Sequence, residues 1–130
     1  MEVIGVITEQ LATLIGLDYS MIDDPHIYIG QSNEIHMNHE HPDTYFLYRE
    51  LIYEIVEDPD YARLDNDGSI EYIKLFKRDD NGDYVKVAVR ISNRGQYFAR
   101  SLYIVKGDRV QRFIKKGLLH PLKTIDNNIF

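Results

Sequence analysis

The spacing of hydrophobic positions changes near residue 70 of this 130-residue chain. Before that point apolar side chains recur every three to four residues, the period of a helix with one buried face. After it they alternate with polar side chains, the period of a strand with one buried face. The pattern predicts an α+β fold in which N-terminal helices pack on a C-terminal antiparallel β-sheet.

Two short strands are predicted in the N-terminal segment, at residues 2–7 and 26–29. Between them Thr8 is a suitable helix N-cap and Gly16 a suitable C-cap, so we expect a brief helix there. Residues 17–25 are predicted to be a loop.

Two helices are predicted next. The first is capped by Ser32 or Asn33 and ends near Pro42, because the residue before a proline avoids helical angles. The second is capped by Asp43, extends to about Asp58 and carries an apolar stripe at helical spacing. The stripe consists of Tyr48, Leu51, Ile52 and Ile55.

The alternating half predicts three strands followed by a helix that Asp108 caps. Asn81-Gly82 is expected to form the tight turn of the first hairpin, since both residues accept positive φ. In the middle strand, Lys86 and Arg90 are expected on an accessible face, opposite the apolar side chains that the helices cover. These apolar residues are Val85, Val87, Val89 and Ile91. The strands are expected at residues 70–77, 83–92 and 97–105.

Composition limits the chemistry that the chain can perform. No run of about 18 apolar residues is present for a membrane span, and no basic, apolar leader begins the chain, so we expect a cytoplasmic protein. The absence of cysteine excludes disulfides and zinc sites built on sulfur. A chain of this length buries enough surface to fold without a metal, and we expect no cofactor.

Charge is divided unequally along the chain. Residues 1–68 contain fifteen Asp or Glu against two Arg, whereas residues 69–130 contain six acids against thirteen Lys or Arg. The net charges of the two parts are therefore -13 and +7. The basic part is compatible with local phosphate binding, and the acidic part repels nucleic acid or meets a basic partner. Two ordinary solvated faces are the alternative interpretation.

Three of the five histidines lie within six positions, at His36, His39 and His41. The ordinary pKa of imidazole, near 6.5, suits a general acid or base at neutral pH. A metal site that adds Glu34 or Glu40 to these imidazoles is one alternative. Solvated histidines on a helix surface are the other.

A second group of candidate residues is cationic and lies on the predicted strands. Cations beside a hydroxyl could stabilise the negative charge that accumulates on a phosphate during its transfer. Neighbouring aromatic rings could stack on unpaired bases. Basic side chains that merely solvate an outward sheet face are the alternative. The polar members are Lys74, Lys86, Arg90, Arg94, Arg100 and Ser101, and the rings are Tyr72, Tyr84, Tyr97, Phe98 and Tyr103.

The order of these segments resembles the phage-associated branch of the barnase, EndoU, colicin and RelE-like nucleases. Three pieces carry the resemblance: a His-x4-His-Pro segment, a helix ending in Asp-Pro-Asp-Tyr, and a late Arg-Ser-Leu-Tyr strand. Shorter matching runs surround them. In this chain the resemblance covers about residues 26–122, and its main runs are His36 to Pro42, Asp58 to Tyr61, Ile70 to Lys74, Lys86 to Arg90, Phe98 to Tyr103 and Phe113 to Gly117.

The resemblance implies a helical portion followed by an antiparallel sheet, and RNA cleavage by acid–base chemistry without a metal. Because no repeat or linker interrupts the sequence, we expect a single domain over residues 1–130. Within it the resemblance implies an N-terminal extension at 1–25, a nuclease-like core at 26–122 and a tail at 123–130. The residues that match family positions are His36, His41, Lys74, Arg90, Arg100, Ser101 and Tyr103. His39 is not among them.

The leading hypothesis is a toxin-like ribonuclease that cuts single-stranded RNA through attack of the ribose 2′-OH, leaving a 2′,3′-cyclic phosphate. Its catalytic residues are predicted to be His36, His41, Arg90, Arg100 and Ser101. Lys74, Lys86, Arg94 and Tyr103 are predicted to bind RNA. The alternative is an inactive phage-encoded binding or inhibitor protein whose acidic half engages a basic host protein. An immunity or host protein partner is compatible with either hypothesis.

Overall fold

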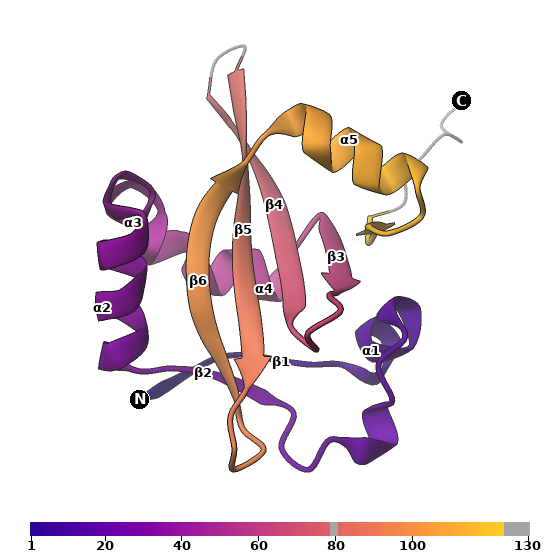
Figure 1. Ribbon diagram of the computed structural model, residues 1–130. Coiled ribbons are helices and arrows are strands. Elements are labelled where there is room, and N and C mark those ends of the chain that lie inside the picture. Colours follow the sequence, from indigo (N-terminus) through magenta and orange to yellow (C-terminus); the bar gives the residue numbers. More distant parts are fainter. Residues whose placement is uncertain (79–80, 124–130) are drawn as a thin grey trace.

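The computed structural model describes residues 1–78 and 81–123, which form an α+β fold around one seven-stranded sheet. The strand order is β1-β2-β6-β5-β4-β3-β7, and neighbouring strands are antiparallel except β2 and β6, which are parallel. Figure 1 shows α2 and α3 beside β6, α4 behind the sheet and α5 at the opposite side. The strands are β1 (Glu2–Val6), β2 (His26–Ile29), β3 (Tyr61–Leu64), β4 (Ile70–Arg78), β5 (Asn81–Ile91), β6 (Tyr97–Val105) and β7 (His120–Pro121).

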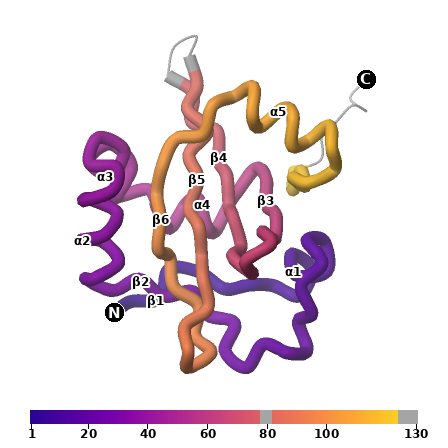
Figure 2. The backbone as a smooth tube through the Cα atoms, in the orientation of Figure 1, coloured from indigo at the N-terminus to yellow at the C-terminus, as the bar shows by residue number. Residues whose placement is uncertain are grey.

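The predicted order of helices before sheet is only partly right, because the first strands of the sheet lie at the N-terminus. β1 pairs with β2, and β2 joins the edge of β6 through Ile27 and Tyr28. Figure 2 shows this N-terminal segment running across one end of the later strands. Residues 1–25 also contribute Ile7, Ala12 and Ile15 to the main core. Of the predicted tail at 123–130, only Lys123 lies within the described residues.

The helix starts differ in detail from the sequence prediction. α1 (Glu9–Ile15) begins with Thr8 accepting a hydrogen bond from the Leu11 N–H and ends at Gly16, where φ is 84°, as predicted. α2 (Gln31–Glu40) begins two or three residues earlier than expected, with Gly30 as its N-cap. Asn33 acts from inside the first turn, where its side-chain oxygen accepts the Gly30 N–H at 2.8 Å.

The long helix predicted from Asp43 to Asp58 is broken into three pieces. They are α3 (Pro42–Tyr48), a 3-10 turn (Arg49–Leu51) and α4 (Ile52–Glu57). Pro42 occupies the first helical turn, where its missing N–H costs nothing, so His41 rather than Asp43 precedes the helix. At the break, Tyr48 is buried against Phe76 and donates a hydrogen bond to Asp83 of β5. This packing fixes the bend around the sheet.

One face of the sheet packs on α4 and forms the main core. Val85, Val87 and Val89 of β5 are fully buried there with Ile52 and Ile55, which confirms the predicted register. Ile91, predicted to be buried with them, is 54% exposed, because it lies at the end of β5 beyond the cover of the helices.

The opposite face of the sheet is partly covered by α5 (Gly107–Lys115). Val110 of this helix is buried against Ile73 and Leu119 in a second, smaller cluster, with Phe113 at its margin. The cover ends before Arg90, which is exposed as predicted. Lys86, predicted to be accessible, is instead only 7% exposed. It lies in the part of this face that α5 and Tyr103 cover.

Both hairpins formed by β4, β5 and β6 differ from the prediction, the first in the position of its turn and the second in its strand register. Asn81 and Gly82 belong to β5, where they pair with Arg78 and Lys77, so they do not form the centre of the first turn. Residues 79 and 80 between the paired positions lie outside the described residues. In the second hairpin, β5 and β6 shift register between Ala88 and Val89. The shift leaves Arg100 as an extra residue of β6, in a bulge of the kind that redirects a side chain.

Candidate active site

A hollow of about 510 Å³ lies where β2, α2, β5 and β6 meet. His36 of α2, Arg90 of β5 and Arg100 of β6 line it together with Phe98. Three residues that the sequence placed among the catalytic candidates are thus brought to one pocket. They come from separate elements, and the bulge at Arg100 is what allows Arg90 and Arg100 to border the same space.

The start of α2 forms another wall of this hollow. Gly30, Ser32 and Asn33 line it, so the partial positive charge of a helix N-terminus adds to that of the two arginines. His36 lies one turn further along the same helix, 4.0 Å from the Glu40 carboxylate through its Nε2 atom. The arrangement places a half-exposed imidazole beside a region that favours a negative charge.

Arg90 has an acidic neighbour in the loop before β4. Its Nη2 atom lies 3.6 Å from the Asp67 carboxylate, and both side chains are about half exposed. Hydrogen bonds from Ser69 lower the pKa of Asp67, with a smaller contribution from the charge of Arg90. Asp67 is therefore ionised at neutral pH and orients Arg90 without burying it. A pair this exposed contributes little to stability and can yield to a phosphate.

His41 lies apart from His36, over Tyr103 of β6. The two rings stack with their centroids 5.1 Å apart and an interplanar angle of 29°. The ammonium of Lys86 lies 4.6 Å from the centroid of the same Tyr103 ring. The ring of Tyr103, which was expected to stack on bases, is therefore already packed against His41 and Lys86. This packing positions His41 on the sheet.

Beneath Tyr103 a line of buried charges crosses the sheet. Lys86 of β5 donates a hydrogen bond of 3.1 Å to Glu71 of β4, and Arg63 of β3 donates one of 3.0 Å to the same carboxylate. The three side chains are about one-tenth exposed. Sequence reasoning missed Glu71 and Arg63. The available signal was an acid between the apolar neighbours Ile70 and Tyr72, on the strand that pairs with Lys86.

Lys74 does not join the predicted cationic face. It pairs with Val85, so it lies on the face of the sheet that packs on α4. Its ammonium lies 2.9 Å from the Asp58 carboxylate and 3.9 Å from that of Glu54. The prediction that Lys74 joins Lys86 and Arg90 across the hairpin is wrong, because Ile73, not Lys74, lies opposite Lys86.

The remaining predicted residues lie near the hollow but do not line it. Ser101 pairs with Ala88 on the same face as Lys86 and Arg90, between the hollow and Tyr103. Arg94 is exposed in the turn that joins β5 to β6. Within residues 1–78 and 81–123, no group of three His, Asp or Glu side chains is arranged to hold a metal ion.

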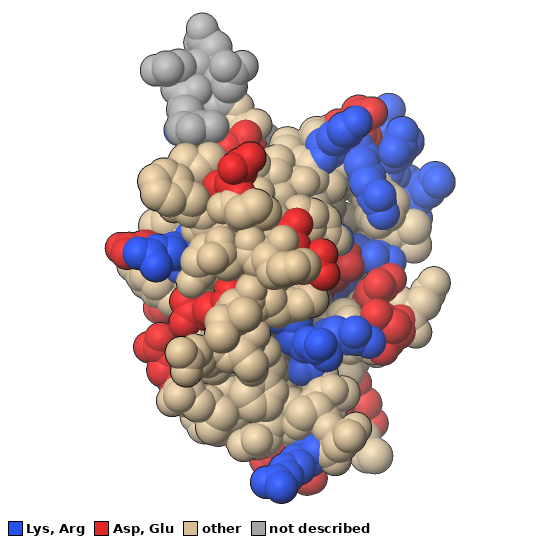
Figure 3. All heavy atoms as spheres, turned by 60° about the vertical axis from the view of Figure 1, so that its left-hand side comes forward, with Lys and Arg blue, Asp and Glu red and all other residues tan. Residues whose placement is uncertain are grey.

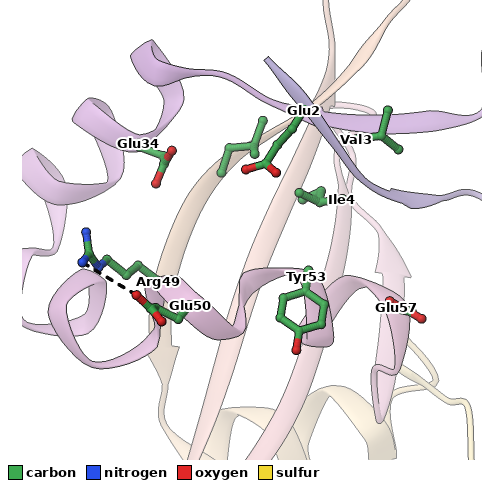
Figure 4. A pocket seen from close by; sticks show the side chains of 9 residues that line it. Glu2, Val3, Ile4, Glu34, Arg49, Glu50, Tyr53 and Glu57 are labelled. Atoms are coloured by element: carbon green, nitrogen blue, oxygen red, sulfur yellow. Dashed lines mark ion pairs between the residues drawn. The ribbon is translucent and has the colours of Figure 1, made fainter.

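A larger hollow, of about 580 Å³, lies on the other side of α2 and has the opposite charge. Glu2, Glu34, Glu50 and Glu57 line it, and Arg49 is paired with Glu50 at 3.8 Å (Figure 4). Carboxylates at this density repel a phosphate chain. Figure 3 shows a group of Lys and Arg at the upper right of its view, and Asp and Glu distributed over the rest of that face.

Comparison with known families identifies the class of protein to which this chain belongs. Residues 2–112 match the family described as phage-Barnase-EndoU-ColicinE5/D-RelE like nuclease3, and the chain belongs to that family. The match confirms the resemblance noted in the sequence and extends it through the N-terminal segment, which the motifs had left out. Comparisons with curated proteins and with solved structures gave no match. No helix in the described part of the chain has the length and apolar character of a membrane span.

Proposed function

We propose that this nuclease-family protein cleaves single-stranded RNA without a metal, at the hollow lined by His36, Arg90 and Arg100. The observation that carries the proposal is the meeting of one imidazole and two guanidinium groups in a single pocket. An imidazole can remove a proton near neutral pH, and guanidinium groups bind phosphate oxygens with well-defined geometry. A toxin-like role with an immunity partner is compatible with this activity.

The proposed reaction begins when His36 takes the proton of a ribose 2′-OH. The 2′-oxygen then forms a bond to the adjacent phosphorus, and Arg90 and Arg100 stabilise the negative charge that accumulates on the phosphate oxygens. The bond from phosphorus to the 5′-oxygen breaks, and that oxygen takes up a proton. Ser101, which lies on the same face between the hollow and Tyr103, would hydrogen-bond to the departing oxygen, whereas His41 and Tyr103 lie further along β6 and would contact the adjoining nucleotides. The products are a 2′,3′-cyclic phosphate and a free 5′-hydroxyl.

The proposal is tested by incubating the protein with RNA and with DNA of the same sequence, both in EDTA. We expect cleavage of RNA alone, with products that end in a cyclic phosphate, because the 2′-OH is the nucleophile. Activity that disappears in EDTA and returns with zinc or manganese would contradict the acid–base reaction.

Replacement of Arg100 by Ala is expected to lower kcat for RNA cleavage about 10²- to 10³-fold, the usual effect of losing one donor that stabilises a developing charge. Because Arg100 is exposed and lies in a bulge, thermal stability should change little. Arg94→Ala is the matched control: Arg94 is also exposed but does not line the hollow. A similar loss of rate in both variants would indicate general electrostatics, not a positioned charge.

A binding role is the second candidate, and the acidic hollow of Figure 4 is the observation that favours it. Its four glutamates could hold a basic segment of a host or immunity protein. A protein that cleaves no RNA but associates with a basic partner through this hollow would make the binding role primary.

A further inference from the structure

We infer that the basic edge of α5 forms a second binding site for the phosphate backbone, so that an RNA strand extends along β6 from the His36 hollow to α5. The inference rests on the proposed function for the identity of the ligand. It adds residues that neither the motifs nor the family match assigns: Lys106, Arg109 and Arg112. These three cations are exposed and line a hollow of about 400 Å³.

The α5 hollow lies on the same face of the sheet as the His36 hollow. Lys86 and Tyr103 line the α5 hollow, and Arg90 and Phe98 line the His36 hollow. These are cross-strand partners in β5 and β6, with Lys86 opposite Tyr103 and Arg90 opposite Phe98. Residues 86 and 90 share a face because side chains alternate along a strand. The two hollows thus follow one another along a single pair of strands.

The separation of the two hollows suits a chain of nucleotides. The four residue steps along β5 from Lys86 to Arg90 span about 14 Å. At about 3.4 Å per stacked nucleotide this corresponds to roughly four nucleotides, and to fewer in an extended strand. His41 and Tyr103 lie at the α5 end of this path, where an exposed imidazole can stack on a base. A dinucleotide at the His36 hollow would not reach α5.

The side chains that pack α5 on the sheet are apolar and are not Lys106, Arg109 or Arg112. Val110 is buried in the second core cluster, with Phe113 and Ile114 packed at its edge. Arg112 is paired with Asp108 at 3.9 Å, but both side chains are more than 60% exposed, so the pair stabilises little and can open. Arg109 packs on the ring of Phe113, 5.2 Å from its centroid, which fixes the plane of the guanidinium and leaves its edge for hydrogen bonds.

The charges on α5 are visible as the group of Lys and Arg at the upper right of Figure 3, and further basic side chains lie lower on that side. Their spacing at 106, 109 and 112 repeats every three residues, which keeps them on one side of the helix. Lys115 and Lys116, also exposed, do not line the hollow. They provide a control of equal charge on the same helix.

The test measures binding of a labelled single-stranded RNA of about eight nucleotides as a function of salt, using the His36→Ala protein so that the RNA stays intact. Adding Arg109→Ala and Arg112→Ala should lower the slope of log Kd against log salt concentration by about 1.4, because each lost phosphate contact in a single strand contributes about 0.7. Adding Lys115→Ala and Lys116→Ala instead should leave the slope close to that of His36→Ala alone.

The result that would overturn the inference is an equal change of slope in the two double-alanine proteins, or no RNA binding by His36→Ala at all. Cleavage distinguishes this failure from failure of the proposed function. Suppose that wild-type protein cuts RNA and that Arg109→Ala with Arg112→Ala changes the cleavage rates of a dinucleotide and of a longer strand equally. The active site is then supported and the second binding site is wrong. If the slope changes as expected but wild type cuts nothing, the second site stands without catalysis.

Discussion

Replacing His36 with Ala should lower the rate of RNA cleavage by roughly 10²- to 10⁴-fold, the range that a positioned general base contributes. His36 is the histidine that shares a hollow with Arg90 and Arg100. Its side chain is half exposed and its one ion-pair partner among the described residues is the exposed Glu40, so the fold should be retained. The measurement is kcat on a single-stranded RNA in EDTA, with thermal melting recorded in parallel.

His39→Ala is the control for this prediction. His39 lies on the same helix and is also exposed, but it does not line the hollow. We expect less than a threefold change in rate for it. Equal losses from His36→Ala and His39→Ala, or a loss accompanied by melting of the fold, would remove His36 from the role of base. A large loss on His41→Ala with His36→Ala unaffected would move the reaction to the Tyr103 end of β6.

Replacing Glu71 with Ala should destabilise the protein by about 3–5 kcal/mol, because two buried cations lose a shared counter-ion. Glu71 accepts hydrogen bonds from both Lys86 and Arg63, and all three side chains are about one-tenth exposed. In the Glu71→Ala protein Arg63 would still be paired with Asp65, which lies 3.2 Å from it. Most of the lost stability should therefore come from the unpaired ammonium of Lys86. Urea unfolding gives the free energy directly.

Glu50→Ala is the control, because it removes a glutamate carboxylate from an exposed ion pair with Arg49. It should lower the free energy of unfolding by less than about 1 kcal/mol. The double variant Glu71→Ala with Lys86→Met tests the reason for the large effect. If the cost comes from an unpaired ammonium, removing that ammonium should recover part of the lost stability. A Glu71→Ala protein as stable as Glu50→Ala would show that water reaches the buried charges.

The elements of this fold were predictable where periodicity is strong and local. The alternation of Val85, Val87 and Val89 predicted the correct buried face. Thr8 and Gly16 are the N-cap and C-cap of α1, as their residue types predict. The assembly of β1 and β2 into the same sheet was not predictable, because it depends on a parallel pairing between β2 and β6 across most of the chain. Local patterns carry no information on such long-range partners.

The candidate site was predictable in its residue types and only partly in its geometry. His36, Arg90 and Arg100 share a hollow, but a bulge that the sequence does not reveal is what admits Arg100 beside Arg90. Lys74 was misplaced for a different reason: even a turn centred on Asn81-Gly82 would set it opposite Val89, on the apolar face, just as the observed pairing sets it opposite Val85. Lys86 was expected in solvent because nothing in its own strand shows that α5 covers it.

The most direct test of the proposed reaction compares an all-ribose strand with the same strand carrying one 2′-deoxy nucleotide at the cleaved position, both in EDTA. We expect wild-type protein to cut the ribose strand to a 2′,3′-cyclic phosphate and to leave the substituted position intact. The His36→Ala protein should no longer cut the ribose strand at an appreciable rate. Equal cleavage of both strands, or no cleavage of either, would contradict it.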